Sequence, residues 1–172
     1  MEHARFWKAV RAGFAATVGM SIVLYAAFLA GMTNFDIAAS MGSLMSSIVP
    51  QPGSAAWIWG LVIHFFVGSI VFPLIYSYAL YPVMQGPNLI RGVMWATFLW
   101  FLMQIIELPI LGRGVFAADS PHQPELIVTT LIAHWVYGAI LGILAGRQAL
   151  LETDLGAEPE RSDFEEARHP IH

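Results

Sequence analysis

Residues 126–146 read LIVTTLIAHWVYGAILGILAG, a run of 21 residues without a charged side chain that is interrupted mainly by His134. A helix rises about 1.5 Å per residue, so a run of this length can cross the roughly 30 Å of hydrocarbon in a bilayer. In lipid a chain must satisfy its own backbone hydrogen bonds, which favours a helix over an isolated strand. The stretch therefore predicts a transmembrane helix.

Three similar runs precede it, at residues 12–32, 57–81 and 89–111. Only 12% of the 172 residues are charged, about half the proportion of an average soluble domain. The sequence therefore predicts an all-α integral membrane protein with four transmembrane helices, contained in a domain of residues 1–151.

Positive charges are distributed unevenly between the two sides of this predicted bundle. One side carries Arg113 alone, and the other carries Arg5, Lys8, Arg11, Arg91 and Arg147. Cytoplasmic loops of membrane proteins are enriched in Lys and Arg. We therefore expect both termini in the cytoplasm and a multi-pass protein of the bacterial cytoplasmic (inner) membrane.

The loop between the first two spans contains a segment with a helical pattern. Residues 36–49, DIAASMGSLMSSIV, have a cap candidate in Asn34 or Asp36 and are followed by Pro50. This pattern predicts a short helix lying in the outer membrane interface.

Residues 152–172 form an acidic cytoplasmic tail, either a docking segment for a basic cytoplasmic partner or simply a solvated end.

The two pairs of spans resemble copies of one helical hairpin. At an offset of 70, the residues Thr130, His134 and Gly138 correspond to Gly60, His64 and Gly68. Each copy has an even number of spans, so both would have the same orientation, as in parallel repeats. Small residues in rows at helical spacing predict close helix packing; those rows contain Gly13, Thr17, Ser21, Gly60, Gly142 and Gly146.

Polar side chains of all four spans fall at a similar predicted depth. This polar layer consists of Tyr25, His64, Gln104, Glu107 and His134. Ionisable groups at such depth are costly and normally face protein. The layer is therefore the predicted functional region.

Three hypotheses account for the layer. In the first, the histidines only hydrogen-bond to Tyr25, Gln104 or Glu107 and fix the helix register. In the second, His64 and His134 are the axial ligands of one b-type haem, and Gly68 and Gly138 give the porphyrin clearance, as in the helix layout of the cytochrome b bundle. In the third, His64, His134 and Glu107 form a metal or proton site, as in a small transporter.

Other chemistry has little support in the sequence. The chain has no Cys, so no thiolate chemistry is available, and it contains no motif typical of catalysis. No catalytic residue is predicted, and the net charge of −4 does not favour nucleic-acid binding. The eight methionines are interpreted as packing residues rather than Cu(I) ligands, because Met20, Met94 and Met103 are scattered in the spans and Met41 and Met45 lie in the predicted loop helix.

The chain resembles an uncharacterised bacterial family of four-span membrane proteins, a domain of unknown function. The resemblance rests on residues 13–17 (GFAAT), on Asp36-Ile37-Ala38 with Gly42-Ser43, and on the two His-x-x-x-Gly motifs. It covers about residues 9–147 and implies the four-helix architecture without an activity. The lipid-facing bulk and the missing catalytic motif favour an accessory or assembly subunit of a larger membrane complex, which contacts lipid and either other membrane subunits or further copies of itself.

Overall fold

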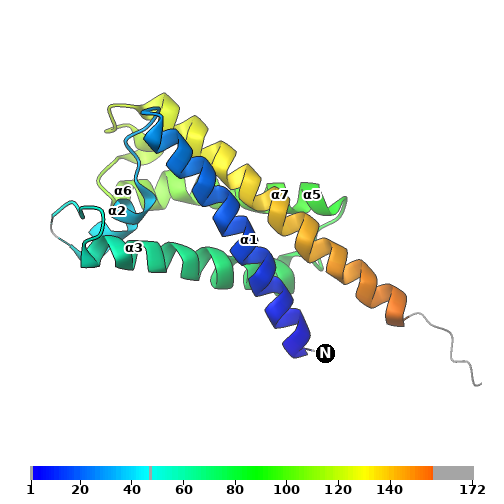
Figure 1. The fold of residues 1–172 in the computed structure, drawn as a ribbon. Helices are drawn as coiled ribbons and strands as arrows, with labels where there is room; N and C mark the ends of the chain where they lie inside the picture. The colour runs from blue at the N-terminus through cyan, green and yellow to red at the C-terminus, as the bar shows by residue number, and fades with distance from the viewer. Residues whose placement is uncertain (1, 47, 157–172) are drawn as a thin grey trace, which may run out of the picture.

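The structure, a computed structural model, describes residues 2–46 and 48–156, and the regular secondary structure in these ranges is helical (Figure 1). Four segments are long and apolar enough to cross a membrane: Arg5–Leu29, Ala55–Leu80, Asn88–Ile110 and Gln123–Gly146. They overlap the four predicted spans, although the first begins and ends earlier than the predicted residues 12–32. The prediction of an all-helical protein with four helices long and apolar enough to span a membrane is confirmed for the described residues.

Two of the spans are single helices and two are composite. The single helices are α1 (Glu2–Leu29) and α7 (Gln123–Gly156). The second span consists of α3 (Ala55–Phe66), η2 (Val67–Val71), α4 (Phe72–Ile75) and η3 (Tyr76–Leu80). The third consists of α5 (Asn88–Leu102), η4 (Met103–Glu107) and α6 (Leu108–Ile110).

The π-helical turns of the composite spans lie just before prolines. The segments η2, η3 and η4 are π-helical, and each ends two residues before a proline: Pro73, Pro82 and Pro109 respectively. Proline has no backbone N–H, and its ring clashes with the carbonyl four residues earlier. The residue before each proline closes the wider turn with a bond to the fifth residue back, from Phe72 to Val67, from Tyr81 to Tyr76 and from Leu108 to Met103. Each π-turn changes which side chains of the span face inward.

The helices do not form a uniform bundle. Helix α7 packs along α5 and also along α1, whereas α3 packs on α2 and, through η2, on α1 (Figure 1). Glycine permits the closest crossing, because Gly92 of α5 lies directly against Gly138 and Gly142 of α7. With α1 and α7 in contact, α3 and α5 lie on opposite sides of a central space.

The loop helix is shorter than predicted, and most of its residues are buried. Helix α2 covers Ile37–Gly42 and is followed by the single 3₁₀ turn η1 (Ser43–Met45). Asp36 is its N-cap, as expected, and accepts hydrogen bonds from the N–H groups of Ala38 and Ala39. The expected extent, residues 36–49, is corrected to Ile37–Gly42 with the turn Ser43–Met45. Helix α2 packs on α3, where Gly60 leaves room for the backbone of α2.

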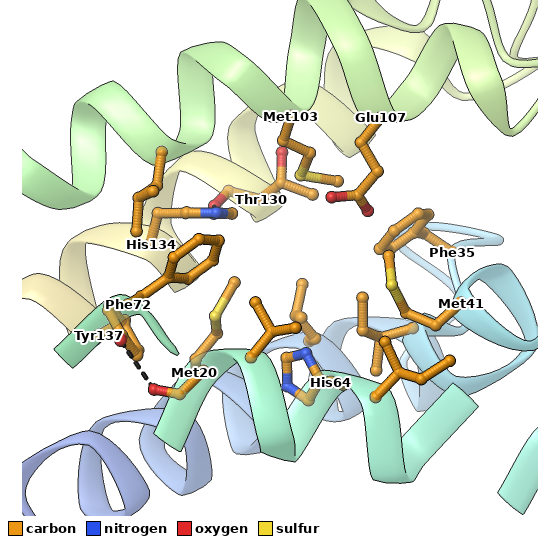
Figure 2. A pocket seen from close by; sticks show the side chains of 16 residues that line it. Met20, Phe35, Met41, His64, Phe72, Met103, Glu107, Thr130, His134 and Tyr137 are labelled. Atoms are coloured by element: carbon orange, nitrogen blue, oxygen red, sulfur yellow. Dashed lines mark hydrogen bonds between the residues drawn. The ribbon is translucent and has the colours of Figure 1, made fainter. Parts of the chain in front are cut away.

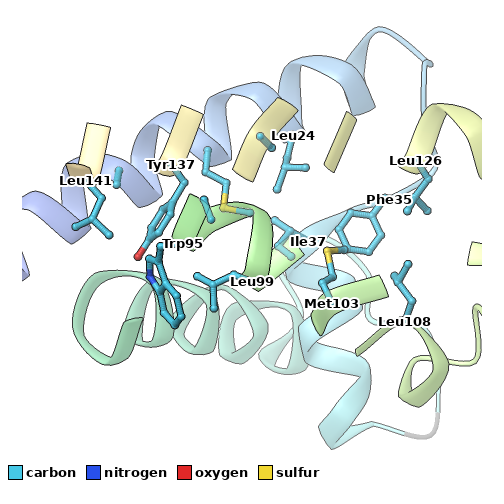
Figure 3. Close-up of a cluster of buried hydrophobic side chains, with 14 of the residues drawn as sticks. Leu24, Phe35, Ile37, Trp95, Leu99, Met103, Leu108, Leu126, Tyr137 and Leu141 are labelled. Atoms are coloured by element: carbon cyan, nitrogen blue, oxygen red, sulfur yellow. The ribbon is translucent and has the colours of Figure 1, made fainter. Parts of the chain in front are cut away.

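A continuous apolar core joins these elements. It includes Leu24, Phe35, Trp95, Tyr137 and Leu141 (Figure 3). Large apolar side chains are also exposed on the outer faces of all four spans, among them Ile22, Trp59, Phe98 and Ile143. Such faces are expected of helices that contact lipid.

A short 3₁₀ turn, η5 (Val115–Ala117), lies in the loop before α7. Helix α7 then continues past the fourth span as far as Gly156. The rest of the predicted acidic tail, residues 157–172, lies outside the described residues.

Candidate functional site

A cavity of about 110 Å³ occupies the space between α3 and α5 (Figure 2). Residues of α1, α2, α7 and the two π-turns η2 and η4 complete its walls. The polar or sulfur-containing side chains that line it are Met20, Met41, His64, Met103, Glu107, Thr130, His134 and Tyr137. No residue in the lining is Lys or Arg. The cavity is thus the place where helices from both halves of the chain bring their polar groups together.

His134 has a defined tautomer in this cavity. Its Nδ1 lies 2.7 Å from the backbone carbonyl oxygen of Thr130, one helical turn earlier. A carbonyl oxygen can only accept, so Nδ1 carries the proton and donates it. The other ring nitrogen, Nε2, is left with its lone pair, which is how histidines that bind ligands are commonly oriented.

His64 is oriented by a short chain of hydrogen bonds from α1. The hydroxyl of Ser21 donates to the carbonyl oxygen of Thr17 over 2.8 Å, and Ser21 Oγ lies 3.0 Å from His64 Nε2. Because the single hydroxyl proton is committed to Thr17, His64 donates from Nε2 to Ser21 Oγ and keeps the lone pair on Nδ1. The two imidazoles lie on opposite walls of the cavity (Figure 2) and are close enough to interact electrostatically.

Glu107 is the only acidic residue in the lining. Its carboxyl group points into the cavity (Figure 2), and it ends the π-turn η4 that precedes Pro109. Among the described residues, none donates a hydrogen bond to this carboxyl group and none forms an ion pair with it. A half-buried carboxyl without a protein partner is unusual in a membrane-spanning segment.

Two members of the predicted polar layer lie elsewhere. Tyr25 donates from its hydroxyl to Asp36 Oδ1 over 3.4 Å, beside α2. Gln104, in η4, is fully buried and donates from Nε2 to Thr130 Oγ1 of α7 over 3.2 Å. Neither residue lines the cavity. The layer thus divides into three cavity residues and two residues that join helices.

The first hypothesis is therefore wrong about the hydrogen-bond partners of the histidines. His64 bonds to Ser21 and His134 bonds to Thr130, so neither bonds to Tyr25, Gln104 or Glu107. These bonds orient the two rings without using the carboxyl group of Glu107.

The cavity lining also contains groups that the sequence interpretation did not select. Met20 comes from α1, Met41 from α2 and Met103 from η4, and all three side chains are directed into the same space (Figure 2). Tyr137 donates to the carbonyl oxygen of Gly68 over 2.8 Å and so joins α7 to η2. In the sequence, Tyr137 could have been selected because it follows His134 by three residues and so lies near the same helix face. The three methionines share no spacing that would have indicated a common site.

The haem hypothesis meets a geometric obstacle. A cavity of about 150 Å³ holds a single benzene ring, whereas a porphyrin contains four pyrrole rings. The space between His64 and His134, at about 110 Å³, is too small for this group. Gly68 lines the cavity, but Gly138 does not, because it lies against Gly92 and Ala96 of α5. The residues therefore do not fit a haem.

The three-ligand metal hypothesis also meets an obstacle. Within residues 2–46 and 48–156 no three His, Asp, Glu or Cys side chains are grouped closely enough to hold a metal ion. His64, His134 and Glu107 share the cavity but do not converge on one point. A site built from these three residues alone is not formed.

The predicted packing residues lie on buried faces of their helices. Gly13 lies against Pro73 and Ser69, and Thr17 lies against Gly68. Gly60 faces α2, while Gly142 and Gly146 face Asn88 at the start of α5. Any side chain at these glycines would meet neighbouring atoms, so they set the distances between the helices that surround the cavity.

One end of the cavity is covered by the loop residues. The guanidinium carbon of Arg113 lies 5.2 Å from the ring centroid of Phe35, a buried residue that lines the cavity. Arg113 also donates to Asn34 Oδ1 over 3.2 Å. Burial lowers the pKa of the Arg113 guanidinium, because desolvation disfavours its charged form. Nearby, Asp36 accepts from Trp57 Nε1 over 3.0 Å, which ties α2 to α3.

The fold and the cavity together define a small multi-pass helical membrane protein with an internal site lined by imidazole, thioether and carboxyl groups. The chain belongs to a family described as Family of unknown function (DUF6789), whose profile matches residues 3–153. No curated protein and no solved structure is significantly similar to the chain.

Proposed function

We propose that this protein is a non-catalytic membrane protein that holds one monovalent cation, either a proton or a metal ion, in its internal cavity. The observation that carries the proposal is the carboxyl group of Glu107, which faces the cavity without a donor or a cation among the described residues.

An ionised carboxylate removed from water must be neutralised or hydrogen-bonded, since its desolvation costs several kcal/mol. The lining offers no Lys or Arg, and the protons of both histidine rings are donated elsewhere. A proton or another cation held in the cavity would supply this neutralisation. One carboxylate balances one charge, which favours a monovalent occupant.

The two histidines would supply neutral lone pairs to that occupant. Nε2 of His134 and Nδ1 of His64 are both left as acceptors by the hydrogen bonds described above. Neutral imidazole is the form that accepts a proton or binds a metal. The site therefore combines one countercharge with two neutral donors.

Infrared spectroscopy of the purified protein tests this proposal. A protonated carboxyl group gives a C=O stretching band that the ionised form lacks. We expect such a band from Glu107 when no metal is present, and we expect it to vanish in Glu107→Gln. Glu125→Gln, which changes an exposed acidic residue at the start of α7, is the matched control and should leave the band unchanged.

The proposal fails if no carboxyl band depends on Glu107 and if no added cation binds. Such a result would mean that Glu107 is ionised and that no cation is bound beside it. A band that also disappears in Glu125→Gln would assign the signal to the wrong residue and would equally count against the proposal.

The orientation in the membrane belongs to the same proposal. Arg5 lies 4.5 Å from the ring centroid of Tyr78, and Arg91 lies 4.7 Å from that of Tyr81, whereas Arg113 lies beside Phe35 of the loop that precedes α2. The positive-inside rule then favours cytoplasmic termini in a bacterial inner membrane, with the cavity nearer the outer side.

This orientation can be tested because the chain contains no Cys. Single cysteines at the exposed loop positions Gln85 and Asp119 should react differently with a membrane-impermeant maleimide. In sealed cells Asp119→Cys should be labelled and Gln85→Cys should not. The opposite pattern would reverse the orientation.

The hypothesis of two parallel repeats has related support from packing. Gly68 lies against Thr17 in the first helix pair, and Gly138 lies against Ala96 in the second. Thr17 and Ala96 are one position apart at the offset of 80 that aligns the first helices of the two pairs. Both pairs therefore use a small residue of the second helix at a comparable crossing point.

An accessory role in a larger membrane complex remains part of the proposal. It is supported by the exposed apolar side chains on every span, which suit either lipid or neighbouring subunits. Photocrosslinking from Phe98, an exposed residue of α5, should give a discrete adduct in native membranes if a subunit covers this face. Only lipid adducts would contradict a partner on that face.

A further inference from the structure

A groove lies on the outside of the protein between the N-terminal half of α1 and the second span. Helix α1 crosses this span at η2 and α4 (Figure 1), and Gly13 lies there against Pro73 and Ser69. Ser69 also lines the groove, whose volume is about 710 Å³. The groove shares no lining residue with the internal cavity, so it is a separate feature of the fold.

Most of the groove is apolar and open to the surroundings of the protein. The rings of Phe14 in α1 and Phe65 in α3 lie 5.8 Å apart, measured between centroids, and join its two walls. Phe14, Val62 and Phe66 all line the groove and are about half exposed. Exposed apolar side chains on membrane-spanning helices contact lipid chains. The walls therefore suit the acyl chain of a lipid.

Arg11 is the one charged residue that the described chain contributes to this lining. Its side chain is exposed, and in the part of the chain that the structure describes it has no hydrogen bond, ion pair or ring contact. Arg5, on the same helix, instead donates to the backbone carbonyl oxygen of Ser77 over 2.6 Å and lies over the ring of Tyr78. The guanidinium of Arg11 is therefore available to a ligand in the groove.

The position of Arg11 along α1 places its charge at the end of the apolar run. Arg11 directly precedes the uncharged residues 12–32, and Trp7, one helical turn earlier, lines the same groove. Arginine and tryptophan at the end of a membrane-spanning helix lie at the level of the lipid headgroups. A lipid whose acyl chain follows the groove would therefore have its phosphate beside Arg11.

The charge of the lining favours an anionic lipid over a zwitterionic one. A guanidinium binds a phosphate through parallel, charge-assisted hydrogen bonds. Of the described residues, no Asp or Glu lines the groove, so none is present to pair with the ammonium group of a zwitterionic headgroup. Basic pockets between membrane-spanning helices bind anionic headgroups in this way.

We propose that this groove binds one anionic phospholipid, with its phosphate on Arg11 and one acyl chain along Phe14, Val62 and Phe66. The lipid comes from the leaflet that surrounds the N-terminal end of α1. This inference goes beyond the proposed function and does not depend on which cation the internal cavity holds, because the two sites share no residue.

Native mass spectrometry of the full-length protein in a non-ionic detergent tests the phosphate contact. The protein is titrated with palmitoyl-oleoyl phosphatidylglycerol and, separately, with the matching phosphatidylethanolamine. A basic residue near the membrane surface raises the affinity for anionic lipid roughly fivefold. We expect Arg11→Gln to weaken the first phosphatidylglycerol by about this factor, and Arg11→Lys to keep most of the preference. Arg113→Gln, the same charge change outside the groove, is the matched control and should leave it unchanged.

A second pair of variants tests the acyl-chain contact. Val62→Trp would fill the groove with a large side chain, and Ile143→Trp makes a similar change on α7, away from the groove. Both residues are 48% exposed, so the two substitutions should be tolerated equally by the fold. We expect Val62→Trp to weaken the first bound molecule of either phospholipid, and Ile143→Trp to weaken neither.

Several results would overturn the assignment. They are equal first-site affinities for the two phospholipids, equal losses in Arg11→Gln and Arg113→Gln, and equal lipid binding in Val62→Trp and Ile143→Trp. A dimer that dissociates in Val62→Trp but persists in Ile143→Trp would place a second copy of the chain in the groove and would also refute the proposal.

Discussion

Replacing Gly138 by alanine should destabilise the protein, because Gly138 lies where α5 and α7 cross. A Cβ at this position would lie 2.6 Å from the Cβ of Ala96, and closer still to the carbonyl oxygen of Gly92. Ordinary contacts between such atoms are about 3.5–4.0 Å, so the two helices would have to separate by about 1 Å. The atoms that Gly138→Ala meets belong to the backbone and to a methyl group, and neither can rotate away.

The expected cost follows from this geometry. Overpacked substitutions cost typically about 1–3 kcal/mol, and a clash with backbone lies at the upper end of that range. We therefore expect Gly138→Ala to lower the free energy of unfolding by about 3 kcal/mol, which is roughly a hundredfold change in the unfolding equilibrium.

Reversible unfolding in mixed micelles with increasing SDS, followed by tryptophan fluorescence, measures this change. Gly19→Ala is the matched control, because its Cβ would meet side-chain atoms alone, Cδ1 of Ile140 at the end of a flexible side chain and Cγ1 of Val136 at 3.4 Å. This control should be nearly neutral. Equal stability of Gly138→Ala and Gly19→Ala would refute the argument that glycine sets the distance between α5 and α7.

Further predictions concern the groups around the cavity. Tyr137→Phe removes the 2.8 Å bond to Gly68 and should cost about 1 kcal/mol or less, as buried hydrogen bonds in membrane proteins do; an unchanged unfolding midpoint in SDS would show that this bond does not join α7 to η2. Asp36→Ala removes the acceptor of Ala38 N, Ala39 N and Trp57 Nε1 and should cost about 2 kcal/mol, whereas Asp119→Ala, in an exposed loop, should cost little in the same assay. The dithionite-reduced absorption spectrum should lack a haem α band after expression with sufficient haem, because the cavity is too small; a band lost in both His64→Ala and His134→Ala would contradict that conclusion.

Much of the architecture was predictable because the membrane restricts the choices. A long uncharged run such as residues 126–146 has to be a helix in lipid, so length and hydropathy were sufficient to identify the spans. The cap at Asp36 was also predictable, since a carboxylate followed by small residues is a local signal. The extent of the following helix was not, because α2 ends where it meets α3, a contact distant in sequence.

The candidate site was predictable only in part. His64, His134 and Glu107 could be selected because ionisable groups are rare in spans, and the structure places them around one cavity. Tyr25 and Gln104 were selected by the same argument from depth, which ignores rotation about the helix axis. The π-turns before Pro73 and Pro109 change that rotation within a span, so depth alone could not identify which side chains face inward.

The sequence by itself determined that the chain is helical and multi-pass, and it indicated which few side chains are costly in lipid, because these properties depend on local composition and on the solvent. Only the tertiary structure decided that the histidines bond to Ser21 and Thr130, that Glu107 has no partner among the described residues, and that three separate methionines line the same cavity. These features depend on helix rotation, on helix crossings set by glycine, and on contacts between distant segments, none of which leaves a periodic signal along the chain.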